Sequence, residues 1–173
     1  MRRPFLFIVL ALLITTILII FDRLGGFNEP EISYESINAY LFAGRHFQGP
    51  TEDPAVEHIF NEMKTIRSEQ DIQGALTMIW LDESTDVQDT VDVFIGIEMQ
   101  EDDDFPAYLD SLQIAMHGLI RARIEGHSSV LPTPESVIHS LREYASENKY
   151  ELQDYVIDKY LSDTLIYTEI PVK

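Results

Sequence analysis

The closing stretch of the chain, residues 155–172, has the pattern of a β-hairpin. A short apolar run, residues 156–161, is followed by polar residues 162–164 and then by a second run, residues 165–172, in which apolar and polar positions alternate. Polar residues between two such runs are typical of a hairpin turn. Residues 76–99 repeat the pattern, with an aromatic residue, a leucine and acids before a polar turn and an alternating strand. The chain therefore contains the same unit twice.

A helix is predicted before each of the two hairpins. Asp53-Pro54 and Thr133-Pro134 each combine an N-cap side chain, which accepts hydrogen bonds from free amides, with a proline at the first helical position. Apolar residues then follow at helical spacing in both segments. They are Val56, Ile59, Phe60, Met63 and Ile66 in the first segment, and Val137, Ile138, Leu141, Tyr144 and Ala145 in the second.

Strand-like segments precede both helices. Residues 32–47 contain alternating apolar positions that predict one strand or a pair of strands, and residues 114–124 form another apolar-rich run. A glycine turn is expected after each segment, at residues 48–50 and at residues 125–127. An acidic loop, residues 98–110, separates the two halves, and it lacks the spacing of a calcium-binding loop.

The order of these elements predicts the fold class. In each half, the first helical residue precedes the aromatic residue of the hairpin, Trp80 or Tyr160, by 26 residues. Since single strands and helices do not alternate, we expect an α+β fold with a mainly antiparallel sheet and two main helices. Two pseudo-symmetric strand-helix-hairpin modules, about residues 31–100 and 101–173, would leave a central cleft between them. Clefts of this kind are common ligand sites.

The first 22 residues predict a membrane anchor. Two arginines precede an apolar run, residues 4–21, which two threonines interrupt. As a helix rising about 1.5 Å per residue, this run is roughly 27 Å long, close to the thickness of the hydrocarbon core of a bilayer. It ends without a small-residue cleavage site, so we interpret it as a transmembrane signal anchor. A cleaved signal peptide and a buried helix are the alternatives.

The charges around this run predict its orientation. The two arginines lie before it, whereas Asp22 and Arg23 balance each other after it. Basic residues tend to stay on the cytoplasmic side. We therefore expect a single-pass protein with a cytoplasmic N-terminus, a glycine- and proline-containing linker over residues 23–30, and an extracytoplasmic domain over residues 31–173, on the periplasmic or outer face.

Composition and charge limit the kinds of molecule that we expect the chain to bind. A chain of 173 residues that is 45% hydrophobic suffices for one packed domain plus the anchor. The net charge of −18 argues against nucleic acid as a partner, since a phosphate backbone requires a basic face. There is no cysteine, and the five histidines have no ligand spacing, so we expect no metal and no cofactor. The oligomeric state is left open.

The hairpins also supply the candidate ligand-binding residues. Trp80 and Tyr160 occupy equivalent positions, and an aromatic face in contact with a lipophilic cation contributes about 0.5–2 kcal/mol. The alternative is that both rings simply fill the core. Asp158, if buried beside these rings, would have a raised pKa, which is typical of functional sites. If exposed, it would pair with Lys149 or Lys159 instead.

The last strand carries two further candidates. Tyr167 and Glu169 share one of its faces, while the apolar residues on the other face point to the core. Glu169 therefore lines a pocket or faces solvent. Phe94, placed at the position equivalent to Glu169 in the first hairpin, is predicted to share its face. No catalytic residue is assigned.

Four short motifs, in this order, resemble a known family. Residues 45–50, Arg-His-Phe-Gln-Gly-Pro, are similar to an Arg-His-x-Gly-Pro turn with one residue inserted. Residues 80–84 are similar to Tyr-Tyr-Asp-Asp-Pro, residues 158–164 to Glu-Ile-Tyr-Leu-Asn-Asp-Pro, and residues 170–172 to a terminal Ile-Pro-Val. This set resembles the GyrI-like small-molecule-binding domain, which is also the effector-binding domain of multidrug-responsive transcription regulators.

The resemblance implies two fused modules around an aromatic-lined pocket, often with a carboxylate that meets cationic, lipophilic ligands. Asp158 stands where the family has its pocket glutamate, and Ser84 and Thr164 replace the turn prolines. Our first hypothesis is a membrane-anchored module that binds an amphipathic or cationic small molecule. Some family members hydrolyse small molecules, so the second is a hydrolase with Asp158 or Glu169 as base. The third is an acidic domain that binds a basic or membrane partner.

Overall fold

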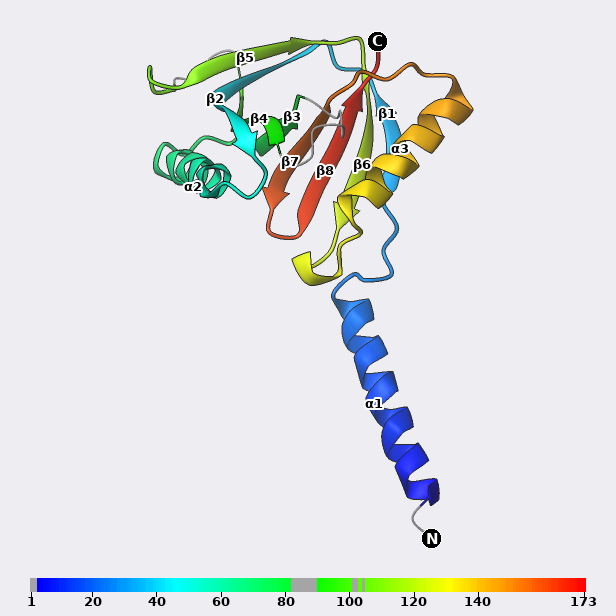
Figure 1. Cartoon of the computed structure of the whole chain (residues 1–173). Coiled ribbons are helices and arrows are strands. Elements are labelled where there is room, and N and C mark those ends of the chain that lie inside the picture. Colours follow the sequence, from blue (N-terminus) through cyan, green and yellow to red (C-terminus); the bar gives the residue numbers. More distant parts are fainter. Residues whose placement is uncertain (1–2, 82–89, 101–102, 104) are drawn as a thin grey trace.

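The computed structural model describes residues 3–81, 90–100, 103 and 105–173, with side chains from residue 7 onwards (Figure 1). The helices are α1 (Arg3–Arg23), α2 (Pro54–Glu69), the short 3₁₀ helix η1 (Ser128–Val130) and α3 (Pro134–Asn148). The strands are β1 (Glu31–Glu35), β2 (Ala39–Pro50), β3 (Leu76–Trp80), β4 (Thr90–Met99), β5 (Asp110–Ala115), β6 (Leu119–Glu125), β7 (Val156–Ser162) and β8 (Leu165–Pro171).

These eight strands form one sheet in the order β1-β6-β8-β7-β3-β4-β2-β5. Every strand pairing in the described part of the chain is antiparallel. Read from either end, the order places corresponding strands of the two modules at mirrored positions, with β3 and β7 in the middle. The α+β class, the two main helices, both hairpins and the pseudo-symmetry are therefore confirmed.

The outermost strands are exchanged between the modules. β1 opens the first half of the chain but pairs with β6 of the second half. β5 opens the second half and pairs with β2 of the first. Each module therefore contains a strand from the other, and the boundary near residue 100 does not separate two independent sheets.

The central ladder fixes the symmetry of the two modules. Met78 lies opposite Asp158, Leu76 lies opposite Tyr160, and Trp80 lies opposite Val156. Met78 and Asp158 are also equivalent in the duplication, so the pseudo-two-fold axis passes beside this pair. Trp80 and Tyr160 are equivalent, as predicted, but they lie at opposite ends of the ladder.

Both helices pack on one face of the sheet, the helix face, and each begins with the predicted cap. The Asp53 carboxylate accepts a hydrogen bond from the amide of Ala55 at 2.8 Å, and the Thr133 hydroxyl accepts one from Ser136 at 3.4 Å. Met63 of α2 packs on the first module and Leu141 of α3 on the second, both fully buried. Full burial of such a side chain contributes about 1.5–3 kcal/mol to the stability of the folded state.

The opposite face of the sheet is concave. A second apolar cluster lies there, with Phe42, Ile79 and Ile157 fully buried. The hydroxyl of Tyr40, on β2, lies 3.4 Å from the carboxylate of Glu169, on β8. Those strands are four places apart in the sheet, roughly 19 Å if it were flat. The sheet therefore curves around this face, as Figure 1 shows for β2 and β5.

Three predicted segment boundaries are wrong. Residues 114–124 are not one run, because residues 116–118 connect β5 to β6 across the sheet. Gly49 is not in a turn, since it pairs with Val91 inside β2. Glu98 belongs to strand β4 rather than to the acidic loop. The first hairpin turn, residues 82–89, and the acids at 101–102 and 104 lie outside the described residues.

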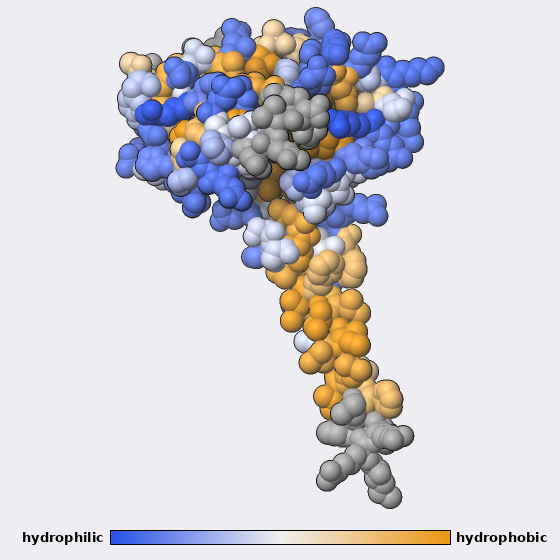
Figure 2. Space-filling view, viewed as in Figure 1, coloured by the Kyte–Doolittle hydropathy of each residue, from blue (hydrophilic) through white to orange (hydrophobic). Residues whose placement is uncertain are grey.

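Helix α1 projects away from the domain (Figures 1 and 2). Its large apolar side chains between Phe7 and Ile20 are 47–68% exposed, and Figure 2 shows a continuous apolar surface along the helix. Within the described residues, no helix meets the length and hydropathy required of a membrane span.

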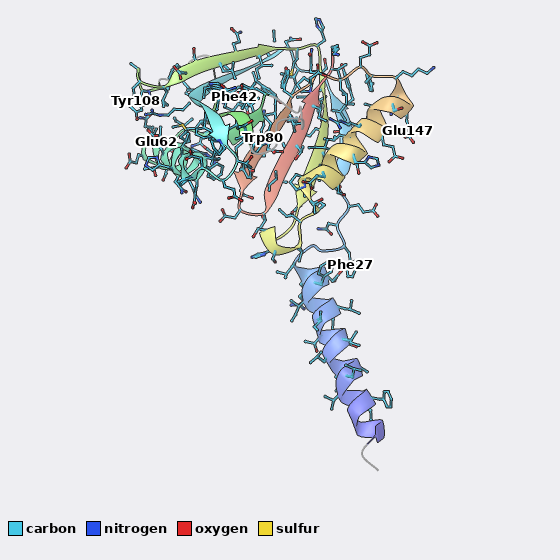
Figure 3. All side chains as sticks on the ribbon, in the orientation of Figure 1. Phe27, Phe42, Glu62, Trp80, Tyr108 and Glu147 are labelled. Atoms are coloured by element: carbon cyan, nitrogen blue, oxygen red, sulfur yellow. The ribbon has the colours of Figure 1, made fainter. Side chains whose placement is uncertain are left out.

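The segment after α1 is held against the domain. The amide of His127 donates a hydrogen bond to the carbonyl of Leu24 at 2.8 Å, and the side-chain amide of Asn28 donates one to Glu125 at 3.0 Å. Phe27, labelled at this junction in Figure 3, packs edge-on against Phe21. The predicted linker is therefore hydrogen-bonded to the turn that follows β6.

We predict that Gly96→Ala destabilises the domain by about 1–3 kcal/mol, because overpacking forces the neighbouring backbone to shift. Gly96 lies opposite Gly44, and a Cβ atom at position 96 would lie 2.6 Å from the carbonyl oxygen of Ala43. Urea unfolding measures the loss. The matched control is Gly49→Ala, whose nearest obstacle is the movable ring of Phe47 at 2.8 Å. Equal losses in both variants would contradict this account.

Candidate functional site

The six candidate residues lie on two faces of the sheet. Alternation along β3, β7 and β8 places three on the helix face and three on the concave face. The helix-face residues are Trp80, Asp158 and Tyr160, and the concave-face residues are Phe94, Tyr167 and Glu169. The predicted single cleft lined by all six is therefore wrong, because the sheet itself separates the two groups.

The equivalence predicted for Phe94 also needs a correction. Phe94 lies opposite Ile79, and Tyr167 lies opposite Lys159. Since Ile79 and Lys159 are equivalent, Phe94 corresponds to Tyr167 and not to Glu169. The shared face is confirmed, and Phe94 is buried in the apolar cluster of that face.

Asp158 is partly buried and held by two neutral donors. The indole nitrogen of Trp80 donates a hydrogen bond to its Oδ2 at 2.9 Å, and the hydroxyl of Thr168 donates one to its Oδ1 at 2.7 Å. Within the described residues it has no ion-pair partner, so the predicted alternative of a lysine pair is wrong. Burial raises the pKa of Asp158, although both hydrogen bonds oppose the rise.

Tyr160 lies beside Asp158 on the helix face. Its ring meets that of Phe60, on α2, edge-on at 5.4 Å between centroids. Burial, together with the negative charge of Asp158, raises the pKa of Tyr160 to about 12. The phenol is therefore neutral at physiological pH.

A cleft opens next to Tyr160, between α2, the closing hairpin and the segment around η1. We call it the junction cleft, because both modules line it, and its volume is about 380 Å³. Its apolar lining consists of Phe60, Leu76, Leu131, Tyr160 and Ile166. Lys64 and Arg67 contribute two cations, and Asp163 one acid. Within the described residues, neither cation has a hydrogen bond or an ion pair.

The concave face holds charges that are almost inaccessible to solvent. Glu169 is fully buried, so it does not face solvent, and Lys159 is 3% exposed. The Nε of Arg121 donates a hydrogen bond to Glu169 at 2.7 Å, and the Nζ of Lys159 donates one to Glu98 at 2.9 Å. With the Tyr40 hydroxyl, these residues form what we call the buried charge cluster.

Charges in this cluster balance each other. Burial lowers the pKa of Lys159, while the carboxylates of Glu169 and Glu98 oppose the change. Burial also acts to lower the pKa of Arg121, but Glu169 and Tyr40 together outweigh it, so that pKa rises. The pKa of Tyr40 is raised by burial and by Glu169, so the phenol stays protonated and donates a hydrogen bond.

Tyr167 completes the concave-face group through Arg121. The guanidinium of Arg121 lies 4.7 Å from the centre of the Tyr167 ring while it also binds Glu169. Tyr40, Arg121 and Lys159 were not predicted as site residues. One sequence signal could have identified Lys159. It lies between Asp158 and Tyr160, and alternation along a strand places it on the face opposite to both.

The chemistry available differs between the two groups. Glu169 is fully buried and paired with Arg121, which is unfavourable for a general base that must reach a substrate. Asp158 has no cationic partner in the described part of the chain and has a pKa raised by burial, but two hydrogen bonds fix its oxygens. Among the described residues, no three acidic or histidine side chains gather as a metal site.

Comparison with solved structures identifies proteins of the same fold. The EcmrR C-terminal domain aligns with a TM-score of 0.57 and 11% identity over 83% of this chain and 98% of that domain. EcmrR in a complex with DNA aligns with a TM-score of 0.62 and 11% identity, over 83% of this chain and 57% of that chain. A hydrolase from Listeria innocua aligns with a TM-score of 0.55 and 11% identity, over 88% of this chain and 98% of that protein.

No protein-family model matches the sequence, and no curated protein matches it significantly. At identities near 11%, the structural likeness establishes the fold alone. It supports the GyrI-like fold that the sequence motifs led us to expect.

We predict that Asp158→Asn changes how stability depends on pH. The folded-state pKa of Asp158 lies above its ordinary value of 3.8, so wild type loses stability as pH rises from that value through the folded pKa. Asparagine cannot ionise, so the unfolding free energy of the variant relative to wild type should increase over this range. Urea unfolding at pH 4, 5, 6 and 7 measures the difference, and a constant difference would refute the assignment.

Proposed function

We propose that the chain is a small-molecule-binding module whose ligand occupies the junction cleft. The observation that carries this proposal is a largely apolar cleft of about 380 Å³ where the two modules meet, with two cations on its wall that have no ion pair with any described residue. Ligand sites are typically concave, largely apolar, and provided with a few polar groups that fix orientation. The cleft has this composition.

The cleft favours an amphipathic ligand with an anionic end. Lys64 and Arg67 lie three residues apart on α2, so they project from the same side of the helix. Phe60 and Tyr160 supply the aromatic part of the wall. Of the two ligand classes expected from the sequence, amphipathic and cationic, a positively charged wall selects the first.

The regulator EcmrR shares the fold, which is consistent with a binding role on this scaffold. Hydrolysis, the alternative expected from the sequence, needs a base that reaches the ligand. Asp158 adjoins Tyr160 but both its oxygens accept hydrogen bonds, so we favour binding without turnover.

We predict that octanoate stabilises the full chain, held in lipid nanodiscs, more than octan-1-ol or octylammonium does. The carboxylate would meet Lys64 and Arg67 while the alkyl chain contacts the apolar wall. Thermal unfolding, followed through the single tryptophan, Trp80, measures the shift. The double variant Lys64→Ala, Arg67→Ala should lose most of the octanoate effect, since a charge-assisted hydrogen bond contributes about 1.5–3 kcal/mol.

Lys173→Ala is the matched control for that experiment, because it removes a cation outside the junction cleft. The proposal is wrong if the double variant and the control respond equally to octanoate. It is also wrong if octylammonium stabilises wild type as well as octanoate does.

We propose further that residues 4–21 anchor the chain in a membrane, with the N-terminus in the cytoplasm and the domain outside. Support comes from the apolar sequence of this run and from the exposed apolar side chains of α1 (Figure 2). An exposed apolar surface of this extent is unfavourable in water. The two N-terminal arginines support the orientation.

We predict that Asn28→Cys becomes labelled by a membrane-impermeant maleimide added to intact cells. The chain has no cysteine of its own, so labelling reports on this position alone. A variant with a cysteine inserted directly after Met1, which keeps both arginines, is the control on the other side and should react only after the cells are lysed. Labelling of position 28 only after lysis would reverse the orientation, and recovery of the chain without membranes would exclude the anchor.

A further inference from the structure

We propose that the concave face contains a binding site for a primary ammonium group, and that the chain's own Lys159 occupies it. This site is separate from the junction cleft, which lies on the other face of the sheet. The inference therefore does not depend on the proposed function.

Aromatic rings form one wall of the site. The Nζ of Lys159 lies 3.2 Å from the centre of the Tyr40 ring and 5.9 Å from that of Phe42. A cation over an aromatic face is attracted by the negative potential of the ring, and the attraction grows when water is excluded. Tyr40 and Phe42 are themselves in contact, with 5.6 Å between their ring centres.

Two carboxylates form the other walls. Glu98 accepts the hydrogen bond from Nζ at 2.9 Å, and Oε2 of Glu169 lies 3.6 Å from the same nitrogen. That Oε2 is buried and has no hydrogen bond of its own. The ammonium of Lys159 therefore donates a hydrogen bond to one carboxylate and lies just beyond hydrogen-bond distance of the other.

These walls do not depend on Lys159 for their positions. Arg121 and Tyr40 hold Glu169, and β4 carries Glu98 in its ladders with β2 and β3. Phe42 is fully buried in the apolar cluster. Removal of the lysine side chain leaves Glu98 and Glu169 with one cation, Arg121, which also lies 3.9 Å from Glu35, so negative charge exceeds positive charge around a fully buried carboxylate. A free cation of the right size would be drawn to it.

The consequence concerns ligand selectivity. Because Lys159 fills the aromatic and acidic site, external cations are excluded from the concave face as long as this side chain is in place. A chain with this fold and a shorter, uncharged residue at the position of Lys159 would be able to bind external cations on its concave face.

The test uses Lys159→Ala in the full chain in nanodiscs. This substitution deletes three carbons and the ammonium, the fragment that n-propylammonium restores. The variant should melt roughly 10 °C below wild type, as expected when a buried charge pair is broken. Propylammonium chloride at millimolar concentration should recover at least half of that loss, whereas propan-1-ol and sodium chloride should not. Wild type should show no propylammonium effect.

Lys159→Met is the matched control, since it fills the space without a charge and should not respond to propylammonium. Two results would overturn the proposal. One is a folded Lys159→Ala variant that propan-1-ol stabilises as much as propylammonium does. The other is a wild-type chain that propylammonium stabilises as much as it stabilises the variant.

A second variant covers the case in which Lys159→Ala does not fold. The chain has no cysteine, so Lys159→Cys can be alkylated selectively while unfolded. Bromoethylamine transfers an aminoethyl group to the thiolate sulfur with loss of bromide, which rebuilds a lysine-like ammonium, and bromoethanol gives the neutral counterpart. Only the aminoethylated chain should refold with a Tm near that of wild type. Equal refolding of both products would refute the ammonium site.

Discussion

Two short crossovers force the sheet to curve strongly. Three residues, 36–38, connect β1 to β2, although these strands are six places apart in the sheet. In a flat sheet that separation is roughly 29 Å, whereas the chain from Glu35 to Ala39 spans at most about 14 Å. Residues 116–118 make the equivalent connection from β5 to β6, and the amide of Met116 donates to the carbonyl of Asn38 at 2.9 Å. The concave face, the contact between Tyr40 and Glu169, and the burial of Glu169 all follow from this curvature.

Within the curved sheet, the register of β3 against β7 decides on which face each charged side chain is buried. With Met78 opposite Asp158, the aspartate faces the helices and Lys159 faces the carboxylates of the concave side. A slip of one residue would exchange the two. It would leave a lysine among the apolar residues under the helices and a third acid beside Glu98 and Glu169. An uncompensated buried charge costs several kcal/mol, so the charges reinforce the register that the apolar residues specify.

Much of this arrangement could be predicted from the sequence, because it depends on local rules. The caps at Asp53 and Thr133 and the alternation in the closing hairpin are local signals, and they located the helices and strands. The equal spacing to Trp80 and Tyr160 revealed the duplication. Equivalent residues of the two halves, such as Pro54 and Pro134, lie 80 residues apart. The same offset relates residues 36–38 to residues 116–118, so the break inside the predicted run at 114–124 could have been predicted from the duplication. The exchange of β1 and β5 between modules was not, since strand partners are set by long-range pairing.

The site was harder to predict than the fold for the same reason. Alternation correctly assigned Tyr167 and Glu169 to one face, but the pairing between strands determined that Asp158 and Glu169 lie on opposite sides of the sheet. Their environments differ accordingly. Asp158 is partnered by neutral donors and has no cation, whereas Glu169 is paired with Arg121 and Lys159. Of the few basic side chains in this acidic chain, two lie among the carboxylates of the concave face, and two on the wall of the junction cleft have no ion pair with any described residue. Net charge alone would favour cationic ligands, whereas the two ligand sites that we propose depend on the local positions of these four basic residues.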